Sequence, residues 1–177
     1  MTVAEALDLI GAGAGRAEGQ LWADLGAGEG TFSRALAELV GARGRVIAVE
    51  RDARAVRELR ALRLSARIDV VAGDIRELNA IAALQDIQLD GALFANVLHF
   101  IEDPAGVLLQ LRRYMKPGSA VLVVEYDRRG ASRWVPYPLP VAQLQVLTRA
   151  VGLTAPVVVG RRKSRYQGEL YCARMQW

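Results

Sequence analysis

The sequence contains few of the residues that build metal centres, disulfide frameworks or membrane spans. Cys172 is the only cysteine and His99 the only histidine, so neither an internal disulfide nor a histidine metal cluster can form. No apolar stretch approaches the roughly 18 residues that a membrane helix needs. Residues 1–5 also lack the basic start and apolar run of a secretion signal. We therefore expect a cytoplasmic protein without a metal, a disulfide or a membrane span.

Lysine is scarce as well. Lys116 and Lys163 are the only lysines, so arginine carries most of the positive charge. Basic residues outnumber acidic ones by 23 to 19, which gives a net charge of +4. So small a surplus permits a nucleic acid partner without indicating one, because nucleic-acid-binding proteins concentrate charge on one face. No feature predicts an oligomeric state.

The apolar residues, 52% of the chain, are enough for the core of one domain and follow a regular order. Short apolar runs alternate with longer amphipathic ones, which is the order of a parallel sheet covered by helices. We predict an α/β fold, doubly wound and Rossmann-like, with a seven-stranded mostly parallel sheet, an antiparallel C-terminal hairpin and helices on both faces. The expected strands are 20–25, 45–50, 68–74, 89–96, 120–126, 156–160 and 168–175, and the expected helices are 31–40, 103–115 and 141–151.

Two segments are expected to be irregular. Apolar residues recur at helical spacing over 3–10, and the glycines at 11, 13 and 15 that follow are expected to form a flexible linker. A basic turn over 161–166 is expected to join the two strands of the terminal hairpin. We expect that turn to be a solvated surface, although its arginines could also hold a phosphate or nucleic acid.

A strand that runs into alternating glycines and then into a helix is the most specific feature of the chain. Gly26, Gly28 and Gly30 allow a ligand to approach the backbone closely, and the helix that follows offers unpaired N–H groups. The dinucleotide fingerprint would place its third glycine at Thr31, so that fingerprint fails by one residue. The loop therefore predicts a nucleotide-like ligand that is not a nicotinamide dinucleotide.

Two carboxylates narrow the choice of ligand. Asp24 lies two residues before the first glycine of the loop, where it would repel a pyrophosphate and attract a cation. Glu50 ends the second strand, 20 residues past Gly30, where a carboxylate can accept both ribose hydroxyls. The ligand is therefore expected to carry a positive charge and a ribose.

S-adenosylmethionine combines a ribose with a cationic group, and the sequence resembles the class I S-adenosylmethionine-dependent methyltransferases, in particular their small-molecule branch. The resemblance covers 21–125. It rests on four motifs. The first is Asp24 to Gly30, the second is the acidic end of the second strand, Val49 to Asp52, and the third is the adenine-contacting turn, Gly73-Asp74-Ile75. The fourth is the region of the fourth strand, which comprises Asn96 to His99, Asp103-Pro104, Leu111-Arg112 and Lys116-Pro117-Gly118.

The resemblance implies S-adenosylmethionine as the cofactor and gives a role to each motif. The methionine part would be held by the backbone of the glycine loop, at Asp24, Leu25, Gly26, Ala27 and Gly28, in the loop that Gly30 completes, and Asn96 would lie beside its amino and carboxylate groups. Glu50 would hold the ribose. Asp74 would accept the adenine amino hydrogens, and Ile75 and Arg51 would pack beside the ring. Two alternatives stay open at this point. Glu50 could pair with Arg51 or Arg54 on the surface, and Asp74 could cap a helix.

The acceptor side is less well defined by the sequence. His99 follows Asn96 by three residues and could be a general base, or it could only pack beside the cofactor. The loop 127–140 carries Arg133, Trp134 and Tyr137, which we predict to contact the substrate, unless the loop is a proline-stiffened lid or a dimer contact. The absence of an Asn-Pro-Pro-Tyr motif argues against methylation of an exocyclic amine.

We therefore predict methyl transfer from S-adenosylmethionine to a small-molecule acceptor. The alternatives are a catalytically silent methyltransferase-like binding module and a nicotinamide-dependent oxidoreductase, the latter opposed by Asp24 and Thr31. The chain 1–177 is expected to be a single methyltransferase domain. It would consist of an N-terminal helix and linker (1–19), a cofactor-binding core (20–126), and an acceptor-side loop, helix and hairpin (127–177).

Overall fold

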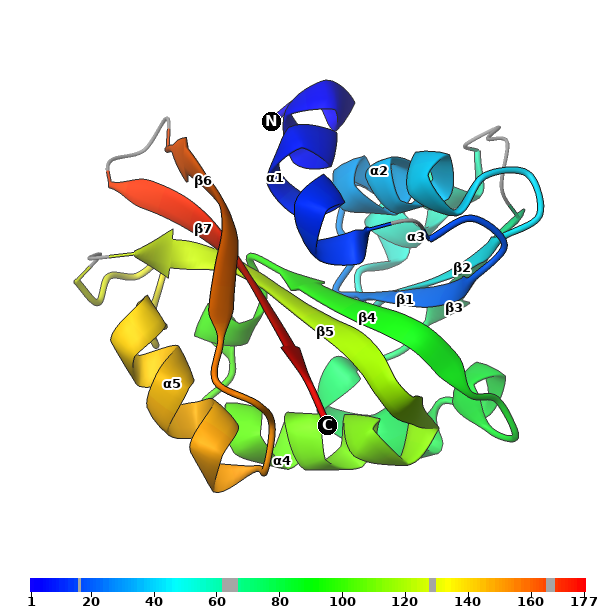
Figure 1. The fold of residues 1–177 in the computed structure, drawn as a ribbon. Coiled ribbons are helices and arrows are strands. Elements are labelled where there is room, and N and C mark those ends of the chain that lie inside the picture. Colours follow the sequence, from blue (N-terminus) through cyan, green and yellow to red (C-terminus); the bar gives the residue numbers. More distant parts are fainter. Residues whose placement is uncertain (16, 62–66, 128–129, 165–167) are drawn as a thin grey trace.

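A single seven-stranded sheet organises the chain in the computed structural model, which describes residues 1–15, 17–61, 67–127, 130–164 and 168–177. The strand order is β3-β2-β1-β4-β5-β7-β6 (Figure 1). Strands β1 to β5 are parallel to one another, and β7 runs antiparallel to both β5 and β6. The predicted fold class is thus confirmed. The strands are β1 (Leu21–Leu25), β2 (Arg45–Glu50), β3 (Arg67–Ala72), β4 (Leu89–Ala95), β5 (Met115–Asp127), β6 (Val157–Lys163) and β7 (Glu169–Gln176).

Helices cover both faces of the sheet, because alternate residues of each strand point to opposite sides. In β2, Val46 and Ala48 pack with residues of α1, α2 and α3, whereas Ile47 and Val49 pack into the core under α4 and α5 (Figure 1). None of the described helices is both long and apolar enough to cross a bilayer. The helices are α1 (Val3–Ala14), α2 (Thr31–Val40), α3 (Ala53–Arg60), α4 (Pro104–Leu111) and α5 (Val141–Ala150), with short 3-10 segments η1 (Ile75–Ala80), η2 (Ala82–Leu84), η3 (Leu98–Phe100) and η4 (Arg112–Tyr114).

The N-terminal helix corrects the predicted linker. Helix α1 continues through Gly11 and Gly13 and ends only at Gly15, whose φ is 63°. A Cβ atom on Gly13 would lie 2.8 Å from the side chain of Leu122 and 3.0 Å from that of Val159. The glycine therefore allows α1 to pack directly on β5 and β6, and this contact outweighs the low helix propensity of glycine.

The basic segment at 161–163 also differs from the prediction, because it continues β6 rather than forming a turn. Arg161 donates to Asp127 at 3.0 Å and to Glu169 at 2.6 Å, and Arg162 pairs with Glu5 of α1. Carboxylates of this chain thus hold two of the cations that could have bound a phosphate. Residues 165–166 of the predicted turn and 128–129 of the predicted loop lie outside the described residues.

Strand β5 begins earlier than expected. Residues 115–119, which precede the predicted strand 120–126, belong to β5: Met115 pairs with Leu89, and after a bulge the pairing resumes at Gly91 and Ala120.

The sheet contains a point at which successive connections leave on opposite faces. Strands β1 and β4 are neighbours, and β1 leads to α2 on one face while β4 leads to α4 on the other (Figure 1). In an open α/β sheet this arrangement leaves a crevice beyond the carboxyl ends of the two strands. The predicted glycine loop and the segment from Asn96 to His99 both begin there.

Candidate methyltransferase site

A cleft of about 260 Å³ lies beyond the carboxyl ends of β1, β2 and β4. It unites seven of the predicted cofactor residues, which come from four separate stretches of the chain: Gly26, Gly28, Glu50, Arg51, Asp74, Ile75 and Asn96. Asp24, Leu25, Ala27 and Gly30 are not among its lining residues. The cleft is also lined by Val49, Gly73 and Val97, which belong to the quoted motifs, and by Arg76, Phe100 and Ile101, which the sequence analysis did not name.

The glycine loop needs its glycines for two different reasons. At Gly26, with a φ of 89°, a Cβ atom would lie 2.5 Å from the side chain of Val97. Gly28, with a φ of 53°, has open space where its Cβ would be, so its backbone is accessible from the cleft. Gly30 adopts the left-handed conformation as the N-cap of α2. The loop therefore presents bare backbone to a ligand.

Glu50 ties the glycine loop to the end of β2. One carboxylate oxygen accepts the N–H of Gly28 at 2.8 Å, and the other accepts those of Arg51 and Asp52 at 2.7 and 2.8 Å. The proposed ion pair with Arg54 is not what the structure shows, because Arg54 pairs with Glu58 at 2.9 Å. Each carboxylate oxygen has two lone pairs, and three of these four already accept a backbone N–H, so Glu50 can still accept one hydroxyl group from the cleft through Oε2.

Asp74 caps the 3-10 segment η1, as the alternative interpretation predicted. Its side chain accepts the backbone N–H of Arg76 at 2.9 Å and also binds the guanidinium of Arg76, with Nη2 at 2.5 Å. Hydrogen bonding to Arg76 holds the pKa of Asp74 below its usual value. The predicted contact of Asp74 with an adenine amino group stays a prediction, and it would require this carboxylate to accept an additional donor.

Asp24 lies wholly inside the protein, at the end of β1 just before the glycine loop. The hydroxyl of Ser33 donates to Oδ2 at 2.6 Å, while Oδ1 is buried without a partner. Burial raises the pKa of Asp24 to about 7; the bond from Ser33 opposes this shift and the charge of Glu50 adds to it. Because it does not line the cleft, its side chain does not meet a ligand there directly.

Asn96 offers an unpaired acceptor to the cleft. It follows β4 in the left-handed conformation, with a φ of 54°, and its backbone N–H donates to the carbonyl of Val124 at 2.8 Å. Its side-chain Oδ1 is buried and has no partner. A buried acceptor without a partner is costly, so the site fits a ligand that supplies an N–H donor at this position.

A buried histidine and a buried carboxylate meet beside this cleft. His99 and Glu125 are 2% and 1% exposed, and Nδ1 of His99 lies 2.7 Å from Oε2 of Glu125. The backbone N–H of His99 donates to Oε1 of the same carboxylate at 3.2 Å. A proton on Nδ1 that is shared with Glu125 leaves the lone pair on Nε2. The sequence analysis missed Glu125, although it is the one charged residue in the apolar run 120–126.

The loop after β5 places only one of its three predicted contact residues near the cleft. The N–H of Tyr137 donates to the carbonyl of His99 at 3.0 Å, and Tyr137 lines a groove that adjoins the cleft. Trp134 is 71% exposed, and the guanidinium of Arg133 lies 5.7 Å from the centre of its ring. Neither Arg133 nor Trp134 is among the lining residues of the cleft or of this groove.

The described part of the chain offers neither a cluster of metal ligands nor a reactive cysteine. No three histidine, cysteine or carboxylate side chains gather there as metal ligands would. Burial raises the pKa of the Cys172 thiol to about 12, so this cysteine is a poor nucleophile.

Several solved structures share this fold. An arsenic(III) S-adenosylmethionine methyltransferase from Chlamydomonas reinhardtii has a TM-score of 0.77 and 22% identity, over 98% of this chain and 72% of that one. A SAM-dependent methyltransferase from Aquifex aeolicus has a TM-score of 0.69 and 20% identity, over 90% and 84%. The mitomycin 7-O-methyltransferase MmcR has a TM-score of 0.70 and 20% identity, over 98% and 53%. At these identities the likeness shows the fold.

Sequence comparison assigns the family. A protein of 37.1 kDa in transposon Tn4556 of Streptomyces fradiae, itself uncharacterized, is 34% identical over 105 residues, which are 59% of this chain and 29% of that protein. The family model described as methyltransferase domain matches residues 19–156. Because that match includes most of the chain and its cleft, the protein belongs to the methyltransferase domain family, as the resemblance predicted.

Proposed function

We propose that this protein transfers a methyl group from S-adenosylmethionine to a hydroxyl group of a small molecule, and that His99 accepts the hydroxyl proton. The observation that carries the proposal is the buried pair of His99 and Glu125 at the carboxyl ends of β4 and β5, next to a cleft with a bare glycine loop. That all seven strands form one sheet supports the further proposal that 1–177 is a single methyltransferase domain.

S-adenosylmethionine is the cofactor of this family, and two of the neighbours above are named as using it. The cleft fits it, because Asn96 Oδ1 lacks a donor, the backbone at Gly28 is open, and Oε2 of Glu50 has one lone pair to spare. We propose that Asn96 contacts the amino group, the backbone at Gly28 contacts the methionine part, and Glu50 contacts the ribose. Asp74, Ile75 and Arg51 would surround the adenine. When bound, the cofactor supplies a methyl group on a sulfonium, whose C–S bond breaks as the acceptor oxygen bonds the methyl carbon.

The part of His99 in this reaction follows from its contacts. Two bonds to Glu125, one from the backbone and one from the ring, fix the orientation of the imidazole. The lone pair on Nε2 can take the proton that the acceptor hydroxyl loses, and the negative charge of Glu125 stabilises the imidazolium that results. A general base of this kind contributes about 10²- to 10⁴-fold to a rate.

The test uses a substitution that keeps the contact and removes the base. The amide nitrogen of asparagine can occupy the place of Nδ1, so His99→Asn retains the bond to Glu125 but has no atom at the position of Nε2. We expect affinity for S-adenosylhomocysteine, measured by calorimetry, to stay within about twofold, and methyl transfer to hydroxylated compounds to fall at least about 100-fold.

Each of the other outcomes would contradict a different part of the proposal. Unchanged transfer by His99→Asn would refute the role of the histidine. Tight binding of the cofactor by the native protein without transfer to any hydroxyl compound would favour the silent binding module. Binding of a nicotinamide dinucleotide, with no binding of S-adenosylmethionine, would overturn the cofactor.

A further inference from the structure

A second hollow adjoins the cofactor cleft and shares one wall with it. This groove of about 360 Å³ is lined by Arg76, Phe100, Glu102, Asp103, Gln110 and Tyr137, among others. Arg76, Phe100 and Ile101 also line the cleft, so the two spaces meet at these residues. We name it the Phe100–Tyr137 groove. Neither the sequence motifs nor the cofactor proposal accounts for it.

Two aromatic side chains of this groove remain in contact with solvent. Phe100 is 52% exposed and Tyr137 is 44% exposed, although each could bury its ring at a gain of free energy. Both lie next to the proposed base. The ring centres of Phe100 and His99 are 4.2 Å apart, and the backbone N–H of Tyr137 donates to the carbonyl of His99. Exposed aromatic rings on the walls of a groove indicate a planar apolar ligand.

The charges of the groove indicate which planar ligands it accepts. Glu102 is exposed, and Asp103 accepts the N–H of Gly106 as the N-cap of α4. The guanidinium of Arg76, the one cation that lines the groove, is bound by Asp74 with distances of 3.0 and 2.5 Å. The groove thus has carboxylates of its own and a cation whose charge is largely neutralised, which disfavours an anionic ligand.

We propose that the Phe100–Tyr137 groove binds the aromatic ring of the acceptor and selects phenolic compounds that carry no negative charge. The inference rests on the proposed function, because it places the phenolic hydroxyl toward His99. It assigns the acceptor contact to Phe100 and Tyr137 rather than to Trp134, which does not line the groove.

The experiment compares three probes on protein saturated with S-adenosylhomocysteine, with binding measured by calorimetry. Tyramine has a phenol and a cationic amine, 4-hydroxyphenylacetate has the same ring with a carboxylate, and 4-(2-aminoethyl)cyclohexanol has the charge of tyramine on a saturated ring. We expect tyramine to bind at least about threefold more tightly than either of the others, because each of them removes one of the two features.

Variants locate the binding. Phe100→Leu and Tyr137→Leu should each weaken tyramine binding by about two- to tenfold, the scale of one ring contact, and Glu102→Gln should reduce the preference for tyramine over 4-hydroxyphenylacetate. Val146→Ala, an exposed position on α5 that lines neither the cleft nor the groove, is the matched control and should change nothing.

The outcomes separate this inference from the proposed function. If S-adenosylhomocysteine binds but tyramine binds no better than the other probes, or if the two leucine variants behave like Val146→Ala, the groove is not the acceptor site while the cofactor proposal stands. If S-adenosylhomocysteine itself fails to bind, the proposed function fails first.

Discussion

The buried carboxyl group of Asp24 should make the protein less stable as the pH rises from about 4 to about 7. Its pKa is raised from 3.8 to about 7 in the folded state, so in this range the folded protein keeps a proton that the unfolded chain has lost. The stabilising contribution is complete below the unfolded pKa and disappears as the pH passes the folded pKa. At about 1.4 kcal/mol per unit, the whole window corresponds to roughly 4 kcal/mol.

Asp24→Asn removes this titration with little change of shape. Ser33 can still donate to the amide oxygen, and the amide group that replaces Oδ1 adds a cost that does not depend on pH. Between pH 5 and pH 8 the native protein should therefore lose about 2 to 3 kcal/mol of unfolding free energy relative to the variant. Urea denaturation at several pH values measures both curves.

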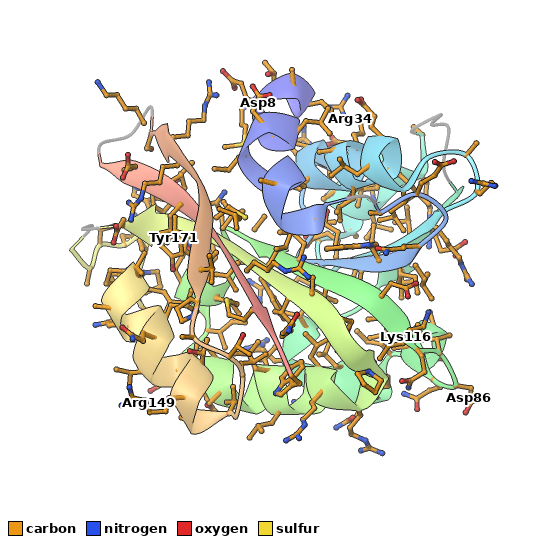
Figure 2. The ribbon with its side chains drawn as sticks, in the orientation of Figure 1. Asp8, Arg34, Asp86, Lys116, Arg149 and Tyr171 are labelled. Atoms are coloured by element: carbon orange, nitrogen blue, oxygen red, sulfur yellow. The ribbon has the colours of Figure 1, made fainter. Side chains whose placement is uncertain are left out.

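The difference between the two curves isolates one residue from all other titrating groups. Asp8→Asn is the matched control, since Asp8 is exposed on α1 near the edge of the molecule (Figure 2), and its curve should run parallel to that of the native protein. Parallel curves for Asp24→Asn as well would show that the carboxyl ionises inside the fold without a cost, and the reasoning from burial would be wrong.

Three further substitutions test other parts of the structure. Glu50→Ala should weaken binding of S-adenosylhomocysteine by about 1.5 to 3 kcal/mol in calorimetry, and unchanged affinity would limit Glu50 to holding the loop. Gly13→Val should lower the unfolding free energy by about 1 to 3 kcal/mol, because its side chain would meet Leu122 and Val159; an unaffected midpoint in urea would mean that α1 shifts freely. Tyr137→Ala should lower methyl transfer more than Trp134→Ala does, because Tyr137 lines the groove and Trp134 does not; a larger loss in Trp134→Ala would return the acceptor contact to Trp134, as its sequence position predicts.

The gathering of the predicted cofactor residues in one cleft follows from local features of the sequence. A strand, three glycines and a helix start lie within a dozen residues, and each glycine is needed for a backbone conformation that no distant contact supplies. The carboxyl ends of parallel strands meet at one edge, so Glu50 and Asn96 had to come close once the strand order was known. The same local logic also identified Asp74 as an N-cap.

The wrong predictions share a different cause, which is that long-range contacts overrode local preference. Gly11 and Gly13 favour a linker by propensity, but α1 gains the close packing on β5 and β6 that only glycine permits. The arginines at 161 and 162 read as a turn because their carboxylate partners, Asp127 and Glu5, are distant in the sequence. No window of a few residues contains these pairs.

The proposed acceptor site also depends on contacts between residues that are distant in the sequence. His99 lies in η3, after β4, and Glu125 lies 26 residues later on β5. Tyr137 reaches His99 through a backbone bond that no side-chain pattern encodes. Burying a carboxylate costs several kcal/mol unless its bonds are satisfied, and the two bonds from His99 meet that need. A purely structural pair could be replaced by apolar residues of similar volume without loss. The contacts of His99 with Phe100 and Tyr137, which both line the groove next to the cleft, are what the proposed proton acceptor for a phenol requires.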